Sequence, residues 1–154
     1  MMTLCRPIPI LIALALIASS GGVAFGSFIP MVTDLTLSGG NITLTFSVPA
    51  PGSDPADATD TTTCDLSWNN DQGTSKITVT TNVASPTATL KVLAGNVVNG
   101  TAAGTITVST TGQDFVTGVT NGSGSCDLEY TATATAGDSA GSDVHTVTFT
   151  VTTV

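Results

Sequence analysis

The chain has 154 residues and a formal net charge of −8, a length that suits one domain and is too short for two ordinary ones. Its acidic, lysine-poor balance repels nucleic-acid phosphates and anionic membrane surfaces, which excludes both classes of partner. Only 9% of residues are charged, and the polarity comes from Thr, Ser, Asn and Gly, as is typical of secreted β proteins.

The first 26 residues have the features of a secretory signal peptide. Arg6 supplies a positive charge, residues 8–18 are apolar, and small residues follow, with Ala24 and Gly26 placed for cleavage. The apolar run is short for a membrane span. We therefore predict cleavage near Gly26 and a secreted or cell-surface protein; the alternative is a retained N-terminal anchor. The mature chain would carry a charge of −9, since eleven acids then face two lysines.

Residues 27–154 are predicted to form a single domain. Apolar and polar residues alternate with a period of two, and Gly, Pro and Asn turns separate the runs. This pattern predicts an all-β fold, a two-sheet Ig-like β-sandwich of about seven to nine short strands. After Gly39-Gly40 the chain either forms a hairpin or crosses between sheets. The expected strands are residues 32–37, 42–48, 61–68, 75–83, 87–93, 104–110, 115–119, 125–134 and 144–151.

Two strands share the pattern Cys-Asp-Leu-x-aromatic. Side chains at alternate positions of a strand share one face, so each cysteine is expected to point inward. Cys5 leaves with the signal peptide, and an even pair in an oxidising compartment predicts a disulfide between Cys64 and Cys126. Such a bridge would contribute roughly 4 kcal/mol; the alternative is two buried free thiols. The predicted core around the bridge is Leu66, Trp68, Leu128 and Tyr130.

The sequence offers no recognisable catalytic or cofactor motif. His145 is the one histidine and is expected at the surface near a loop. Asp54, Asp57 and Asp60 recur at every third position of a Pro-rich loop, a weak calcium pattern whose alternative is a solvated acidic loop. We therefore expect no metal, no cofactor and no enzymatic activity.

The start of the mature chain is apolar and extended. Its alternative roles are the first strand of its own domain, or a donor strand that adds to the open sheet edge of a neighbouring subunit. Donation of this kind does not close on itself and yields a fibre. This assembly segment spans residues 27–37, as either a donor strand or a first strand. Its apolar residues are Phe28, Ile29, Met31, Val32, Leu35 and Leu37.

Residues 75–82, 128–134 and 145–151 together resemble the Thr/Val strands of small exported bacterial β-sandwich proteins of the fimbrial or pilus-subunit and spore-coat-U-like type. The resemblance lies in a Tyr-Thr-x-x-Ala strand followed by a terminal Thr/Val strand. It implies an assembly role, homopolymeric or with other surface subunits, and no catalytic residues. The predicted function is a structural subunit of a surface filament, pilus or coat. The alternatives are a monomeric adhesin or carbohydrate-binding module and a secreted enzyme.

Overall fold

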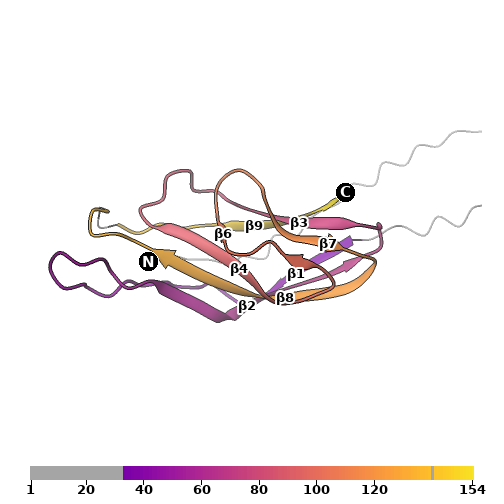
Figure 1. Cartoon of the computed structure of the whole chain (residues 1–154), viewed down its shortest axis with the longest axis horizontal. Helices are drawn as coiled ribbons and strands as arrows, with labels where there is room; N and C mark the ends of the chain where they lie inside the picture. Colours follow the sequence, from indigo (N-terminus) through magenta and orange to yellow (C-terminus); the bar gives the residue numbers. More distant parts are fainter. Residues whose placement is uncertain (1–32, 140) are drawn as a thin grey trace, which may run out of the picture.

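The computed structural model describes residues 33–139 and 141–154; the predicted signal peptide and residues 27–32 lie outside these ranges. Nine strands and no helix occur in the described residues (Figure 1). The strands are β1 (Thr33–Ser38), β2 (Ala58–Asn70), β3 (Ser75–Thr81), β4 (Thr89–Val98), β5 (Thr101–Ala102), β6 (Ile106–Thr107), β7 (Gln113–Val119), β8 (Gly122–Thr133) and β9 (Val147–Thr153).

The strands form two antiparallel sheets. One has the order β1-β2-β8-β4-β6, and the other has the order β5-β7-β3-β9. Figure 1 shows β3, β7 and β9 in one layer and β2 and β8 in the other. The short strands β5 and β6 belong to different sheets, so the chain crosses between the layers there. The predicted all-β, two-sheet sandwich is confirmed.

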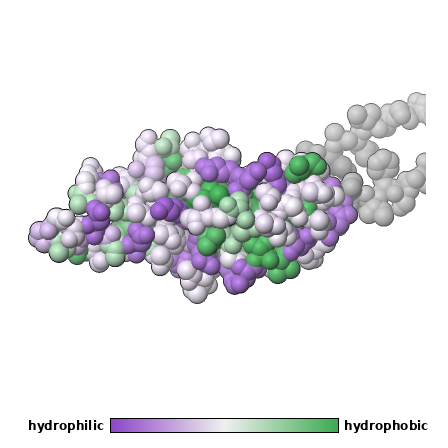
Figure 2. Space-filling view, viewed as in Figure 1, coloured by the Kyte–Doolittle hydropathy of each residue, from purple (hydrophilic) through white to green (hydrophobic). Residues whose placement is uncertain are grey.

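One hydrophobic core fills the space between the sheets. Leu66, Trp68, Leu128 and Tyr130 face it from the first sheet, each at most 3% exposed. The second sheet contributes alternate residues of β3 and β9, together with Phe115, Val116 and Val119 of β7. The rings of Phe115 and Phe149 lie 5.2 Å apart at 49°. On the outside, Figure 2 shows hydrophobic groups as small separate patches among neutral and hydrophilic ones. The period-two alternation of the sequence therefore gives these strands one face toward the core and one face toward solvent.

The predicted strand at residues 42–48 is wrong. Ile42 makes an isolated bridge, and no strand forms in this segment although Ile42 and Leu44 are buried. Gly39 has a φ of 98°, and a β-carbon there would collide with the Thr63 carbonyl oxygen. The turn takes the chain out of the first sheet, so the apolar alternation packs against the core with only the single bridge at Ile42 in place of a ladder. The predicted strand at 104–110 likewise reduces to β6.

The predicted disulfide between Cys64 and Cys126 is also wrong, because Cys126 is a free, buried thiol. Strands β2 and β8 are neighbours in the same sheet, where Cys64 lies opposite Leu128 and Cys126 lies opposite Leu66. The cysteines are thus diagonal neighbours, whose Cα atoms are typically ~7–8 Å apart, beyond the reach of ordinary disulfide geometry. Periodicity predicted the inward face of both side chains correctly, but it carries no information on register.

Candidate assembly surface

Strand β9 is the outermost strand of its sheet and pairs only with β3 among the described strands. The Val154 amide donates to the Thr74 carbonyl at 2.9 Å, one position beyond the Ser75–Thr153 pair. Antiparallel pairs alternate between hydrogen-bonded and non-hydrogen-bonded positions. Residues 148, 150 and 152 therefore bond to β3, while the N–H and C=O groups of Val147, Phe149, Val151 and Thr153 point to the side of β9 away from β3.

This edge lacks the features that usually prevent association. β9 has seven residues with no charge, no proline and an unbroken register with β3. Edge strands are normally blunted by charge, Pro, a bulge or short length. The edge strands β5 and β6 have two residues each, and β1 carries Asp34. Among the described strands, β9 is thus the long unprotected edge. The sequence predicted the strand, and its uncharged composition was the signal that could have indicated an open edge.

Strand β1 is the corresponding edge of the other sheet and approaches β9 along one side of the sandwich. Its inward-facing side chains, Leu35 and Leu37, pack against the core but stay partly exposed. The structure therefore uses these two predicted assembly residues as part of the first strand of their own domain. The other four, at positions 28, 29, 31 and 32, lie outside the described residues. β1 is thus an edge strand whose apolar side chains are only partly buried.

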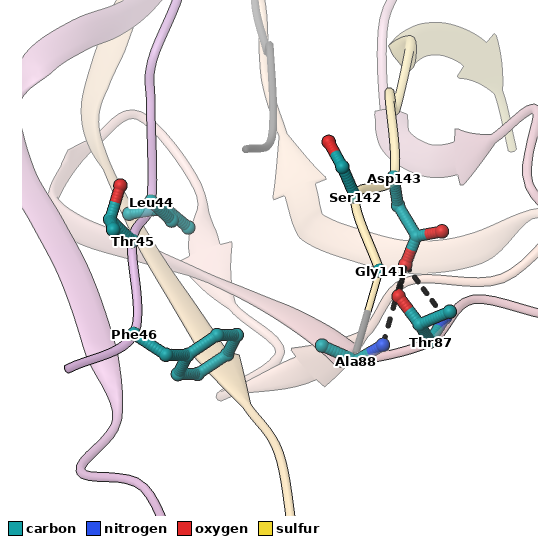
Figure 3. Close-up of a pocket in the computed structure, with 8 residues that line it drawn as sticks. All are labelled: Leu44, Thr45, Phe46, Thr87, Ala88, Gly141, Ser142 and Asp143. Atoms are coloured by element: carbon teal, nitrogen blue, oxygen red, sulfur yellow. Dashed lines mark hydrogen bonds between the residues drawn. The ribbon is translucent and has the colours of Figure 1, made fainter. Parts of the chain in front are cut away.

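A cavity of about 210 Å³ lies beyond the start of β9. Figure 3 shows Leu44, Thr45 and Phe46 on one wall and residues 87–88 and 141–143 on the other. Asp143 accepts hydrogen bonds from the Thr87 amide and hydroxyl, each at 2.6 Å, and from the Ala88 amide at 3.3 Å. These bonds, led by the Thr87 hydroxyl, lower the pKa of Asp143. The carboxylate thus connects the segments that lead into β4 and β9.

His145 is buried, at 2% exposure, which corrects the expected surface position. Its Nδ1 lies 2.9 Å from the Thr81 hydroxyl, and its Nε2 is buried without a hydrogen-bond partner. Burial lowers the pKa of His145, and the nearby Asp143 partly opposes this effect. The reason for the burial is the alternation that continues back from β9 and turns this side chain toward the core. An imidazole that is buried in this way beside the Thr81 hydroxyl is a poor general base, because a substrate cannot reach it.

The predicted calcium candidates are not brought together. Asp54 accepts from the Ala136 amide at 2.7 Å, while Asp60 accepts from the Thr63 amide and hydroxyl at 3.0 and 2.7 Å. Asp57 is exposed. Across the described residues, no group of three or more His, Cys, Asp or Glu side chains is placed to hold a metal. Asp60 therefore stabilises a local backbone turn, as Asp side chains commonly do, whereas Asp54 joins its loop to the distant backbone at Ala136.

Comparison with known proteins assigns this chain to no family. No protein-family model matches the chain, and no curated protein matches it either. The described part of the chain contains no helix long and apolar enough to cross a membrane. Among the described residues, the two edge strands β1 and β9 are the features that bear on assembly.

Proposed function

We propose that this chain is an exported, non-enzymatic structural subunit of a surface filament or coat, assembled by strand donation. The observation that carries the proposal is the incompletely covered β1 edge, where Leu35 and Leu37 remain partly exposed. An added strand with bulky apolar side chains would remove this surface from water, at about 25 cal/mol per Å². Strand addition to an open edge supplies backbone hydrogen bonds as well.

The donor is the apolar segment at residues 27–32, which precedes β1. It contains Phe28, Ile29 and Met31 and no charged residue. β2 ends at Asn70, opposite Thr33, so its register leaves no β2 residue to pair with anything before Thr33. Six extended residues span about 20 Å, which matches the six residues of β1. The segment therefore suits the β1 edge of a second copy.

Repeated donation in one direction generates a fibre. The donor and acceptor surfaces differ, so the contact is heterologous and does not close into a dimer. Each copy offers one donor and one acceptor, and the chain of contacts continues. A surface filament is the assembly that this arrangement favours.

The site chemistry supports a structural role over catalysis. The one histidine is sealed in the core, and the Asp143 carboxylate in the cavity is occupied by three hydrogen bonds. A nucleophile, a general base and an oxyanion site would have to converge in one accessible place for hydrolysis. The described residues offer no such convergence.

One observation favours the alternative of a monomeric binding module. Phe46 is partly buried and lines the same cavity as Thr45 and Ser142, so one cavity has both an apolar ring and hydroxyl groups in its lining. Carbohydrate sites combine an apolar surface with a few polar groups in this way. A glycan-binding screen of native protein and Phe46→Ala tests this alternative, which requires binding that the substitution abolishes.

The test of the proposed function is electron microscopy and sedimentation of the exported chain. We expect regular fibres from the native protein and their loss in Ile29→Asp, because a buried charge in the donor strand is costly. Val48→Asp is the matched control, since Val48 is 97% exposed and lies outside the strands, between β1 and β2. A monomer at every concentration, or fibres unaffected by Ile29→Asp, would refute strand donation.

A further inference from the structure

Beyond strand donation at β1, we propose a second assembly contact, in which β9 pairs antiparallel with β9 of another copy about a twofold axis at Thr150. The contact joins the two four-stranded sheets into one continuous sheet of eight strands. It uses the edge of the other sheet and does not require the donor segment. The partner is a second copy of this chain.

The register follows from the outward-pointing backbone groups. Val147, Phe149, Val151 and Thr153 each present an N–H and a C=O to the free edge, as the phase of the β3–β9 ladder requires. With the axis at Thr150, Phe149 meets Val151 of the second copy and Val147 meets Thr153. All the free groups of β9 are then paired. An axis at Phe149 would place Thr153 opposite residue 145, which precedes β9. An axis at Val151 would place Val147 opposite a position beyond the end of β9 at Thr153. Either shift pairs fewer of the outward groups within the strand.

The side chains are compatible with this self-pairing. The inward face would bring Phe149 beside Val151 of the second copy, an aromatic and β-branched pair of the kind that stabilises sheets. On the outer face Thr150 would meet Thr150, and Thr148 would meet Thr152. These residues continue the threonine rows that β3 and β9 already form through the Thr78–Thr150 and Thr80–Thr148 pairs.

Charge explains why association would use this strand. The chain carries a net charge of −8, so most of its surface repels a second copy. β9 has no charged residue, and its neighbour β3 has only Lys76, which pairs with Asp114 at 2.7 Å. The β9 edge is therefore a neutral strip on an acidic protein. Its four outward hydrogen-bonding residues favour a strand as its occupant.

Cysteine cross-linking tests the axis directly in the full chain. A residue on the axis lies opposite itself, at a non-hydrogen-bonded position where Cα atoms are ~4.5 Å apart, within disulfide range. Thr150→Cys should therefore cross-link with itself under mild oxidation. Thr148→Cys and Thr152→Cys are the matched controls: each alone should stay uncross-linked, whereas their mixture should form the heterodimer. The native chain, with its own cysteines, sets the background.

A second measurement separates backbone pairing from side-chain packing. Val151→Pro removes an outward N–H and no bond to β3, while Val151→Ala trims the side chain and keeps the N–H. In sedimentation experiments the proline variant should weaken the dimer about thirtyfold relative to the alanine variant, because two hydrogen bonds are lost per dimer.

The outcomes distinguish this contact from strand donation. Equal cross-linking of Thr150→Cys and Thr148→Cys, or equal dimerisation of the Pro and Ala variants, overturns the β9 pairing. Fibres that persist in Val151→Pro and vanish in Ile29→Asp leave the proposed function intact. Dimers that persist in Ile29→Asp support the β9 contact, with or without fibres in the native protein.

Discussion

Gly124 lies directly opposite Trp68 across β2 and β8, and the indole occupies the space where a β-carbon of residue 124 would stand. Trp68 is 3% exposed, so its ring has little room to move away. The largest side chain of the core thus depends on the absence of a side chain on the neighbouring strand.

The substitution Gly124→Ala is therefore expected to destabilise the fold by about 1–3 kcal/mol, the usual cost of overpacking a core. Urea unfolding measures the change. Gly137→Ala is the control, because a β-carbon there meets no atom closer than 3.9 Å. If both variants unfold at the same urea concentration, the close packing of Trp68 on Gly124 is not a stability determinant.

Asn99 joins two turns. It has a φ of 58°, its amide nitrogen donates to the Thr120 carbonyl at 2.9 Å, and its side-chain oxygen accepts from the Thr120 amide and hydroxyl at 3.0 and 2.7 Å. Asn99→Ala loses these bonds and places alanine in a left-handed conformation, so it should cost about 2–3 kcal/mol. Asn99→Gly should cost less, because glycine adopts this φ freely. Thermal unfolding of the two variants separates the terms, and a glycine variant as unstable as alanine would contradict the role of the backbone.

The buried thiol of Cys126 should make stability fall at high pH. Burial, reinforced by Asp127 and Asp65, raises the pKa of Cys126 from 9.0 to about 12. Between these values the unfolded chain releases the proton while the folded chain keeps it, so the free energy of unfolding decreases as pH rises through this window. Urea titrations at pH ~8 and ~10.5 should show a smaller loss for Cys126→Ala than for the native chain. An identical loss in both proteins would remove Cys126 as a cause.

The same thiol should be chemically inert in the folded protein. The thiolate is the reactive form, and the raised pKa keeps Cys126 protonated at neutral pH. Alkylation by iodoacetamide at this position, followed by peptide mass spectrometry, should occur only after unfolding. Rapid modification of Cys126 under native conditions would mean that the core opens readily.

His145 should make stability fall on the acidic side. Burial lowers its pKa below the ordinary 6.5, against the opposing attraction of Asp143. In this range the unfolded chain binds a proton that the folded chain does not, so stability is full above pH 6.5 and decreases as pH falls below it. His145→Gln, which keeps a hydrogen-bonding group near Thr81, should flatten the change between pH ~7.5 and ~5. An unchanged pH slope in this variant would show that other groups cause the acid sensitivity.

The sequence alone determined the all-β class, most strand positions and the inward face of residues such as Leu66, Trp68, Leu128 and Tyr130. Side-chain direction in a strand is a local property of the pleat, so period-two alternation is enough to read it. The tertiary structure decided what local pattern cannot encode. Pairing register placed Cys64 and Cys126 diagonally, without the predicted bridge, and the turn at Gly39 left residues 42–48 without a ladder. The burial of His145 and the position of β9 as an edge depend on which strands become neighbours, and that choice is made by contacts between residues far apart in the chain.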